Sequence, residues 1–242
     1  MACAEHCPRC GLACTSASRL ARHLQRKFPC AVGGAEGEFD QKIRAARPLD
    51  DYRPGIQIKA RDTMALGSGM PTQYQYTLVA RPGKDFDPNF TPAFTPGEML
   101  RLGVFSGKYI NDCTNEFPRE WFAAARGRLR PGAADPKVNL FGVKSRKSIQ
   151  FWRAKGWIPV TAGDRDPRGW FQWYCRYWLG RRMPAVDDVQ IKRWKAYVRH
   201  AGQIRASYLK PGAAVPITRH DKLTHRAKQR QGLLQWAHDP WV

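Results

Sequence analysis

The stretch Gly169-Trp-Phe-Gln-Trp-Tyr-Cys-Arg-Tyr-Trp-Leu-Gly-Arg-Arg182 decides the fold class of this chain. Its aromatic residues recur at helical spacing, namely Trp170, Trp173, Tyr174, Tyr177 and Trp178. Asp166 can cap this helix, Pro167 fits its first turn, and Gly180 ends it. We expect the tryptophans to pack in a core rather than to serve as stacking platforms, because they follow the helical period.

Further helices are predicted on both sides of this stretch. Thr95-Pro96-Gly97-Glu98 is a capping box that opens a helix over 96–102, and Gly103 sits where a C-terminal cap belongs. The other predicted elements are a strand over 73–80, a loop over 81–95, a helix that starts at 117–122, and helices over 146–155, 184–201 and 222–237. The sequence therefore predicts a mainly α-helical globular domain with a minor β element.

The predicted domain order has three parts. Residues 1–30 read as a small zinc finger, residues 31–70 as a linker rich in glycine, and residues 71–242 as a basic, Trp-rich, mostly helical domain. A hydrophobic fraction of 43% supplies enough material for a core, so the chain as a whole is not of the disordered class.

The charge of the chain indicates a polyanionic partner. Its 242 residues include 41 Lys and Arg against 20 Asp and Glu, a net charge of +21, and the pI is about 10.2. Lysine and arginine side chains that neutralise phosphates release counterions, so this excess favours nucleic acid. No run of 18 apolar residues and no signal peptide is present, so we expect no membrane partner and no secretion.

The basic residues are concentrated in the C-terminal part of the chain. From Arg181 to Val242 there are thirteen Lys and Arg against four Asp and Glu, interleaved with Trp and Tyr. The predicted nucleic-acid-binding residues are Arg181, Arg182, Lys192, Arg193, Lys195, Arg199, Arg226, Lys228 and Arg230. We expect DNA rather than RNA as the ligand, and an acidic protein partner or a larger assembly remains an alternative.

The N-terminus carries the spacing of a zinc site. Of the seven cysteines, five lie in the first thirty residues, which indicates metal binding in a reducing, intracellular compartment such as a nucleus, a viral factory or a virion. Cys7 and Cys10 form a Cys-x-x-Cys pair, twelve residues separate Cys10 from His23, and six separate His23 from Cys30. These four residues are the predicted ligands of one structural Zn²⁺.

Rival zinc ligands remain open, namely Cys3, His6 and Cys14. The span 7–30 resembles the zinc-finger family in a Cys-Cys-His-Cys variant, as in single fingers at the N-termini of large DNA virus proteins. Leu20-Ala-Arg-His23 and Lys27-Phe-Pro-Cys30 match the later parts of that pattern. Cys14 departs from it, since a core Phe usually stands there.

The larger domain also resembles a known group of proteins. Residues 169–182, together with Asp188-Val-Gln-Ile-Lys-Arg-Trp194 and Gln229-Arg-Gln-Gly-Leu-Leu-Gln-Trp-Ala237, are similar to an uncharacterised family from bacteria, algae and large viruses. The resemblance covers roughly 95–240. The resemblance implies one folded domain, and no activity can be inferred from it.

Catalytic residues are harder to find in the sequence. Carboxylates that could hold a divalent metal are Asp112, Glu116, Glu120, Asp187 and Asp188, and His200 could act as a base. Asp187 and Asp188 also suit a helix N-terminus. We expect a non-enzymatic nucleic-acid-binding protein. The alternatives are a nuclease or base-excision enzyme targeted by its finger, and a structural component of a virion or ribonucleoprotein.

Overall fold

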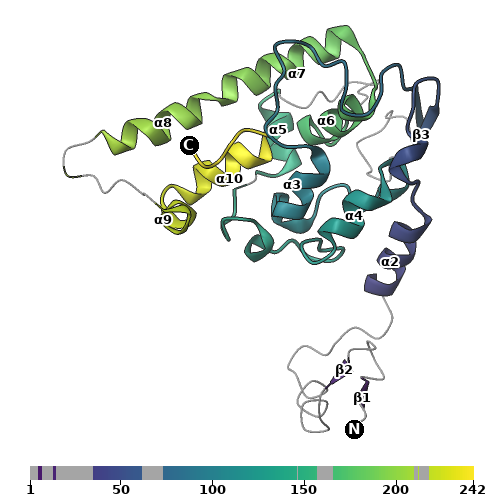
Figure 1. The fold of residues 1–242 in the computed structure, drawn as a ribbon, viewed down its shortest axis with the longest axis horizontal. Coiled ribbons are helices and arrows are strands. Elements are labelled where there is room, and N and C mark those ends of the chain that lie inside the picture. The colour runs from purple at the N-terminus through teal and green to yellow at the C-terminus, as the bar shows by residue number, and fades with distance from the viewer. Residues whose placement is uncertain are drawn as a thin grey trace. The chain divides into compact units, whose positions relative to one another are not determined.

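A computed structural model describes residues 5–6, 13–14, 35–61, 73–145, 147–156, 166–209, 212 and 218–242 (Figure 1). The chain divides into two compact units, Met1–Arg44 and Ala45–Val242. In the first unit, strand β1, Glu5–His6, pairs antiparallel with β2, Ala13–Cys14. Helix α2, Ala35–Ala45, follows.

The second unit is mainly helical and globular, as the sequence predicts. Its strands are β3, Gln57–Arg61, and β4, Gln73–Thr77. Its α-helices are α3, Pro96–Leu102; α4, Arg119–Ala125; α5, Ile149–Ala154; α6, Trp170–Leu179; α7, Pro184–Tyr197; α8, Arg199–Tyr208; α9, Arg219–Thr224; and α10, Ala227–Gln235. Short 3-10 turns are η1, Leu49–Asp51; η2, Phe105–Gly107; η3, Thr114–Glu116; and η4, Pro136–Val138.

Helix α6 is the centre of this unit. Every side chain of it except that of Trp178 is buried, because its surface is apolar nearly all round and must be covered on all sides. Phe90, from the loop before α3, is 1% exposed. Its ring meets Trp173, Tyr174, Tyr177 and Trp194 edge-to-face, with centroids 5.0–5.5 Å apart. The expectation that the tryptophans pack in the core is confirmed for Trp173, which is fully buried.

Helix α10 is the second buried helix, and its glutamines hold two loops. Gln231 accepts a hydrogen bond from Phe141 N at 3.1 Å and donates one to Gly103 O at 3.0 Å. Gln235 accepts from Phe105 N at 3.1 Å and donates to Ser145 O at 2.7 Å. Side-chain amides can satisfy a backbone donor and a backbone acceptor at once, so these loops are pinned although they form no regular structure.

The predicted linker over 31–70 contains regular structure. Helix α2 and strand β3 fall within it, and β3 pairs antiparallel with β4 in the register Gln57↔Thr77 to Arg61↔Gln73. Ile58 and Ala60 of β3 are buried while Lys59 is exposed, so the strand has one apolar face. The glycines of this stretch suggested a linker, but the pairing partner of β3 lies beyond it in the sequence.

The predicted helix over 96–102 is confirmed in its bounds and in its caps. Thr95 Oγ1 accepts from Glu98 N, and the Glu98 carboxylate accepts from Thr95 N at 2.8 Å, so the capping box is complete. Helix α5 is shorter than predicted and begins after Ser148, whose hydroxyl accepts from Phe151 N. No helix in the described part of the chain is long and apolar enough to cross a membrane.

Two predicted helices are each divided. The helix predicted from 184 breaks at Val198, where α7 ends and α8 begins, and together α7 and α8 run along one edge in Figure 1. The helix predicted over 222–237 is α9 and α10, separated at Arg226, which adopts a left-handed conformation with φ of 51°. Helix α8 packs on α10 through Ala201, Ile204 and Leu233.

Candidate functional site

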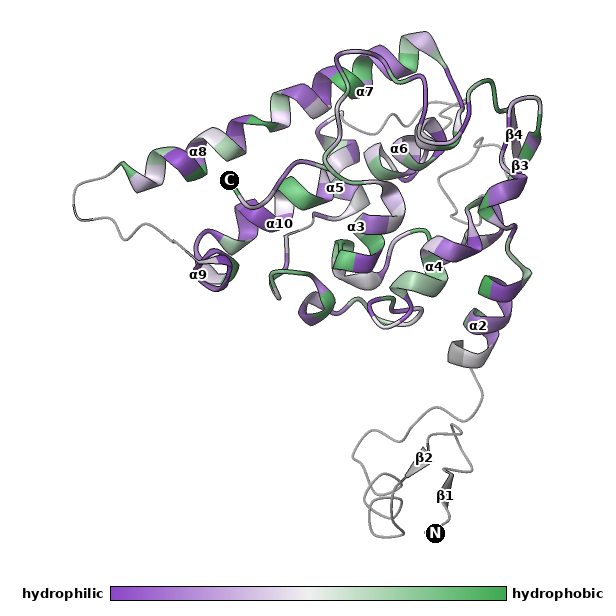
Figure 2. Cartoon of the chain, in the orientation of Figure 1, coloured by the Kyte–Doolittle hydropathy of each residue, from purple (hydrophilic) through white to green (hydrophobic). Residues whose placement is uncertain are grey.

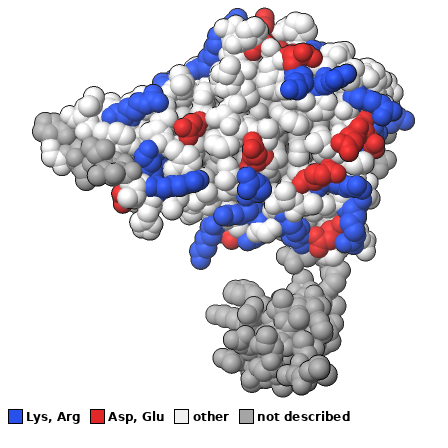
Figure 3. All heavy atoms as spheres, viewed as in Figure 1, with Lys and Arg blue, Asp and Glu red and all other residues white. Residues whose placement is uncertain are grey.

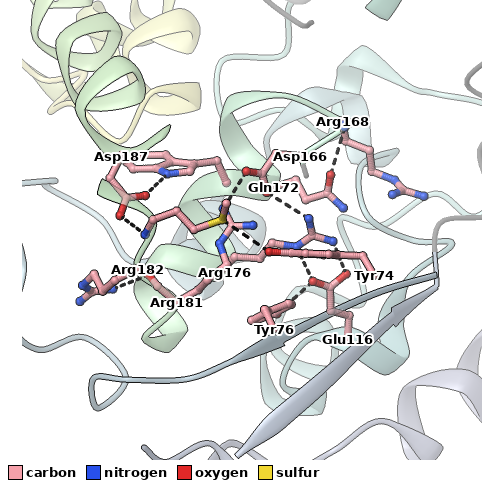
Figure 4. A network of polar contacts seen from close by, with 12 residues as sticks. Tyr74, Tyr76, Glu116, Asp166, Arg168, Gln172, Arg176, Arg181, Arg182 and Asp187 are labelled. Atoms are coloured by element: carbon pink, nitrogen blue, oxygen red, sulfur yellow. Dashed lines mark hydrogen bonds and ion pairs between the residues drawn. The ribbon is translucent and has the colours of Figure 1, made fainter. Parts of the chain in front are cut away.

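A buried ionic network joins α6 to the segments around it (Figure 4). Arg176 of α6 binds both carboxylate oxygens of Glu116, with Nη2 at 2.9 Å from Oε2, and its Nη1 lies 3.0 Å from Asp166 Oδ1. Tyr76 of β4 donates its hydroxyl to Glu116 Oε1 at 3.0 Å. Both Arg176 and Glu116 are at most 1% exposed, so this pair is desolvated and bidentate.

The electrostatics of the network favour the ion pair. Burial lowers the pKa of Arg176, but the charges of Glu116 and Asp166 outweigh burial and raise it well above its usual value. Burial, followed by the charge of Glu116, raises the pKa of the Tyr76 phenol. Glu116 is therefore held by Arg176 and Tyr76. Its two carboxylate oxygens join η3, which carries Glu116, to α6 and to β4.

Arg181 belongs to this network, and its predicted role as a phosphate ligand is wrong. It is 1% exposed, and its Nη2 lies 2.7 Å from Asp166 Oδ2. Its guanidinium also lies 5.7 Å from the centre of the Tyr76 ring. Asp166, predicted as a helix cap, instead bridges Arg176 and Arg181, and α6 starts after Gly169.

The acidic residues predicted as metal-ligand candidates do not converge. Asp112 pairs with Arg168 at 2.6 Å, and burial followed by the charge of Arg176 lowers the pKa of Arg168 to about 10. Glu120 accepts from Leu49 N at 2.9 Å. Among the residues that the structure describes, no group of three or more His, Cys, Asp and Glu is placed to hold a metal ion.

Asp187 fixes the start of α7. Its carboxylate accepts from Met183 N at 2.6 Å and from Trp173 Nε1 at 2.8 Å. Burial raises the pKa of this carboxyl, although the two donors act in the opposite direction. The expected role of Asp187 at a helix N-terminus is confirmed, and the contact with Trp173 ties α7 to the buried helix α6.

Helix α7 and the start of α8 present a row of cations to solvent, which we call the basic face: Lys192, Lys195 and Arg199. Their spacing of three and four residues places them on one side of the helix, and the buried Ile191 and Trp194 lie on the adjacent side. Figure 2 shows hydrophilic and hydrophobic positions alternating along α7 and α8, and Figure 3 shows lysine and arginine atoms over this edge.

The basic face contacts the loop before α3, and its own two helices carry two acidic residues. Lys195 Nζ donates to Asn89 Oδ1 at 2.7 Å. The acidic residues of α7 and α8 are Asp187, which is buried, and Asp188, which is exposed. Seven residues of helix separate Lys192 from Arg199, which is about 10 Å along the axis. These cations can contact phosphates along one strand without rearranging the helix.

The other predicted phosphate ligands divide by exposure. Arg182 is half-buried over the Tyr177 ring at 4.0 Å and donates to the carbonyls of Lys84 and Asp85, so it clamps a loop. Arg193 is half-buried and donates to Gly156 O at 3.4 Å. Arg226 and Lys228 are exposed at the start of α10.

The prediction that Arg230 binds phosphate is wrong. Its side chain is 0% exposed and donates to the carbonyls of His225, Pro240 and Val242 and to the Tyr208 hydroxyl. A buried guanidinium with four internal acceptors is a structural brace between α10 and the chain that follows it.

The predicted zinc ligands Cys7, Cys10, His23 and Cys30 lie outside the described residues. In the described part, Cys113 and Cys175 are buried free thiols whose pKa burial raises well above the usual value. Such thiols are poor nucleophiles, because the thiolate is the reactive form. His200 contacts Gln203 at 3.1 Å on the surface of α8.

One exposed aromatic residue was not among the predicted site residues. Phe151 of α5 is 37% exposed, with Lys147 beside it. The signal that could have found it is the sequence from Lys144 to Lys155, which holds five Lys and Arg and no Asp or Glu.

Comparison with protein-family models, curated proteins and solved structures finds no match for this chain.

Proposed function

We propose that this protein binds nucleic acid, DNA in preference to RNA, without catalysing a reaction, and that it contacts the phosphate backbone through Lys192, Lys195 and Arg199. The single observation that carries the proposal is the basic face. Three cations project from one side of a helix whose adjacent side is packed in the core, and Asp188 is the exposed acid of α7 and α8.

The distribution of charge supports this proposal. In the network and its neighbouring pair, Arg168, Arg176 and Arg181 face the exposed Asp112 and the buried Glu116 and Asp166, so three arginines are matched by three carboxylates. The excess of +21 therefore resides outside the network. Surface cations repel one another in the free protein, and a polyanion relieves the repulsion.

The proposal is tested by fluorescence anisotropy of labelled duplex DNA, single-stranded DNA and RNA across a salt series. The variant Lys192→Gln/Lys195→Gln/Arg199→Gln should lower the magnitude of the log–log salt slope for duplex by about 2–3, at ~0.9 for each phosphate contact. A matched control, Arg53→Gln/Lys59→Gln/Lys108→Gln, removes the same charge from exposed positions elsewhere and should change the slope less.

Two outcomes would contradict the proposal. Equal losses in the two triple variants mean that binding is spread over the surface and that the basic face is not the interface. Weak binding of the unaltered protein to all three ligands at physiological salt rejects the function. The excess charge is then assigned to docking on an acidic protein partner.

The second part of the proposal is a structural zinc ion held by Cys7, Cys10, His23 and Cys30. The antiparallel pair of β1 and β2 supports it, because residues 7–12, which include Cys7 and Cys10, connect the two strands. Zinc fingers of the C2H2 type are built from two strands and a helix, and metal binding supplies most of the folding free energy of so small a unit, ~10–16 kcal/mol.

Replacing Cys7 by Ser should release about one zinc ion per chain, as measured by native mass spectrometry. Cys3→Ser is the matched control and should leave the zinc content unchanged. Retention of zinc by Cys7→Ser, or its loss in Cys3→Ser, would show that the ligand set is wrong.

A further inference from the structure

Helix α5 exposes an aromatic ring in a segment of purely positive charge. Among the residues that the structure describes, Phe151 is the only exposed aromatic side chain. Exposure of one such ring is unexpected here, because the other aromatic residues of the described part are buried or half-buried. In sequence, the stretch from Lys144 to Lys155 holds five Lys and Arg and no Asp or Glu, and Lys147 and Lys155 are exposed.

The ring is held in place on its helix. Ser148 caps α5 and accepts from Phe151 N at 3.1 Å, so the backbone at Phe151 is fixed. Trp152 packs edge-to-face with the Phe151 ring, with centroids 5.2 Å apart and planes at 82°. A ring that is oriented by its neighbours loses little conformational freedom when a ligand stacks on it.

Cations stand at the positions where a stacked nucleotide needs them. Lys147 Nζ lies over the Phe151 ring, 5.2 Å from its centre, and Lys155 is exposed one turn after Phe151. An exposed cation–π contact is weaker than the stacking of a base on an aromatic ring. A base can therefore replace Lys147 at the ring, and the ammonium group can then contact the phosphate.

The α5 segment is also linked to the basic face. Arg193 of α7 donates to the carbonyl of Gly156, directly after α5, at 3.4 Å. Arg193 neighbours Lys192 in sequence, so the exposed ring and the row of cations belong to connected elements of the same unit. Helix α5 and the basic face are therefore parts of two elements that contact each other.

We propose that Phe151 is a stacking platform for an unpaired base, flanked by Lys147 and Lys155 as phosphate ligands, and that the protein therefore prefers single-stranded nucleic acid to duplex. This inference rests on the proposed nucleic-acid binding and names its substrate class. In a duplex, each base is already stacked and paired, so its face is not available to a side chain. A cationic groove with an aromatic ring is the arrangement that binds single strands with little sequence preference.

The test compares a 15-nucleotide oligo-dT, a 15-nucleotide oligo-U and a 15-base-pair duplex by anisotropy at one salt concentration. Phe151→Leu keeps an apolar side chain and removes the aromatic face. It should weaken binding to the single strands about 5- to 150-fold, which is ~1–3 kcal/mol at 1.4 kcal/mol per tenfold, and leave duplex binding within about 2-fold.

Two further variants make the result specific to stacking. Phe151→Tyr restores an aromatic face and should recover single-strand affinity. Val189→Ala alters another exposed apolar side chain, on α7, and should change neither affinity. The melting temperature of each variant, followed by circular dichroism, should match that of the unaltered protein, because both altered side chains are exposed.

The failure of this inference can be told apart from the failure of the proposed function. If the unaltered protein binds the ligands and Phe151→Leu weakens single strand and duplex equally, or weakens neither, the stacking platform is rejected while nucleic-acid binding stands. If the unaltered protein binds none of the three ligands, both are rejected.

Discussion

Glu116 shows how a single residue can look catalytic in sequence and be structural in the fold. Its carboxylate is buried with Arg176 and accepts a third hydrogen bond from Tyr76. Loss of one partner of such a pair leaves an uncompensated charge in a low-dielectric interior, a cost of about 3–5 kcal/mol. The same desolvation makes the pair a weak source of net stability while it is intact.

We therefore expect Glu116→Gln to lower the free energy of unfolding by about 3–5 kcal/mol, as measured by urea denaturation. The control is Asp188→Asn, which alters an exposed acid and should change stability by no more than about 0.5 kcal/mol. A Glu116→Gln protein as stable as the unaltered chain would contradict the structural role of this carboxylate.

Sequence reasoning separated core from surface well for aromatic residues and poorly for arginines. Helical spacing placed Trp173 in the core, where it lies. Arg181 and Arg182 are adjacent and share the same flanking sequence. Arg181 is nevertheless buried against Asp166, whereas Arg182 stacks on Tyr177. Which arginine turns inward depends on a partner fixed by the tertiary fold, and no local pattern carries that information.

At the scale of elements, the end of α6 depends on a glycine that no other residue can replace without strain. Gly180 has φ of +112°, and a Cβ at this position would lie 2.0 Å from the carbonyl oxygen of Ala80. Its own carbonyl accepts from Val79 N and Ala80 N, which joins the end of α6 to the chain after β4. Both the conformation and the close approach require glycine.

Backbone strain alone should make Gly180→Ala lower the free energy of unfolding by ~1–3 kcal/mol. The clash between the new Cβ and the Ala80 carbonyl should lower it further. Gly202 is the matched control, because it is exposed in α8 and a Cβ there meets nothing within 4 Å. Gly202→Ala should raise stability by ~0.5–1 kcal/mol. Thermal and urea unfolding of both variants measure the difference, and a neutral Gly180→Ala would show that this junction can move.

Local signals predicted elements where the chain stabilises them locally. The capping box at Thr95 and Glu98 gave the bounds of α3, since both of its hydrogen bonds lie within four residues. Strand β3 was missed because its partner β4 follows only after further chain. The division of the predicted helix into α9 and α10 at Arg226 was missed. A residue other than glycine that adopts a left-handed conformation cannot be recognised from the local sequence.

For the whole molecule, the distribution of charge has a measurable effect on stability. The buried ion pairs are shielded from solvent ions, whereas repulsion among the exposed cations of a chain with a net charge of +21 is screened by salt. Raising NaCl from 0.05 to 0.5 M should therefore stabilise the free protein by about 1 kcal/mol, a rise of ~2–4 °C in melting temperature. Differential scanning calorimetry measures this, and a fall in melting temperature would mean that surface ion pairs outweigh the repulsion.

The buried glutamines of α10 bear on how the chain matures on the ribosome. Gln231 binds the carbonyl of Gly103, 128 residues earlier in the sequence, and Gln235 accepts a hydrogen bond from Phe105 N, 130 residues earlier. At ~5–20 residues per second, those loops wait roughly 6–26 s before the amides that satisfy them have been synthesised. Until then their polar backbone must remain hydrated, so we expect these loops to reach their final positions only after translation has delivered α10.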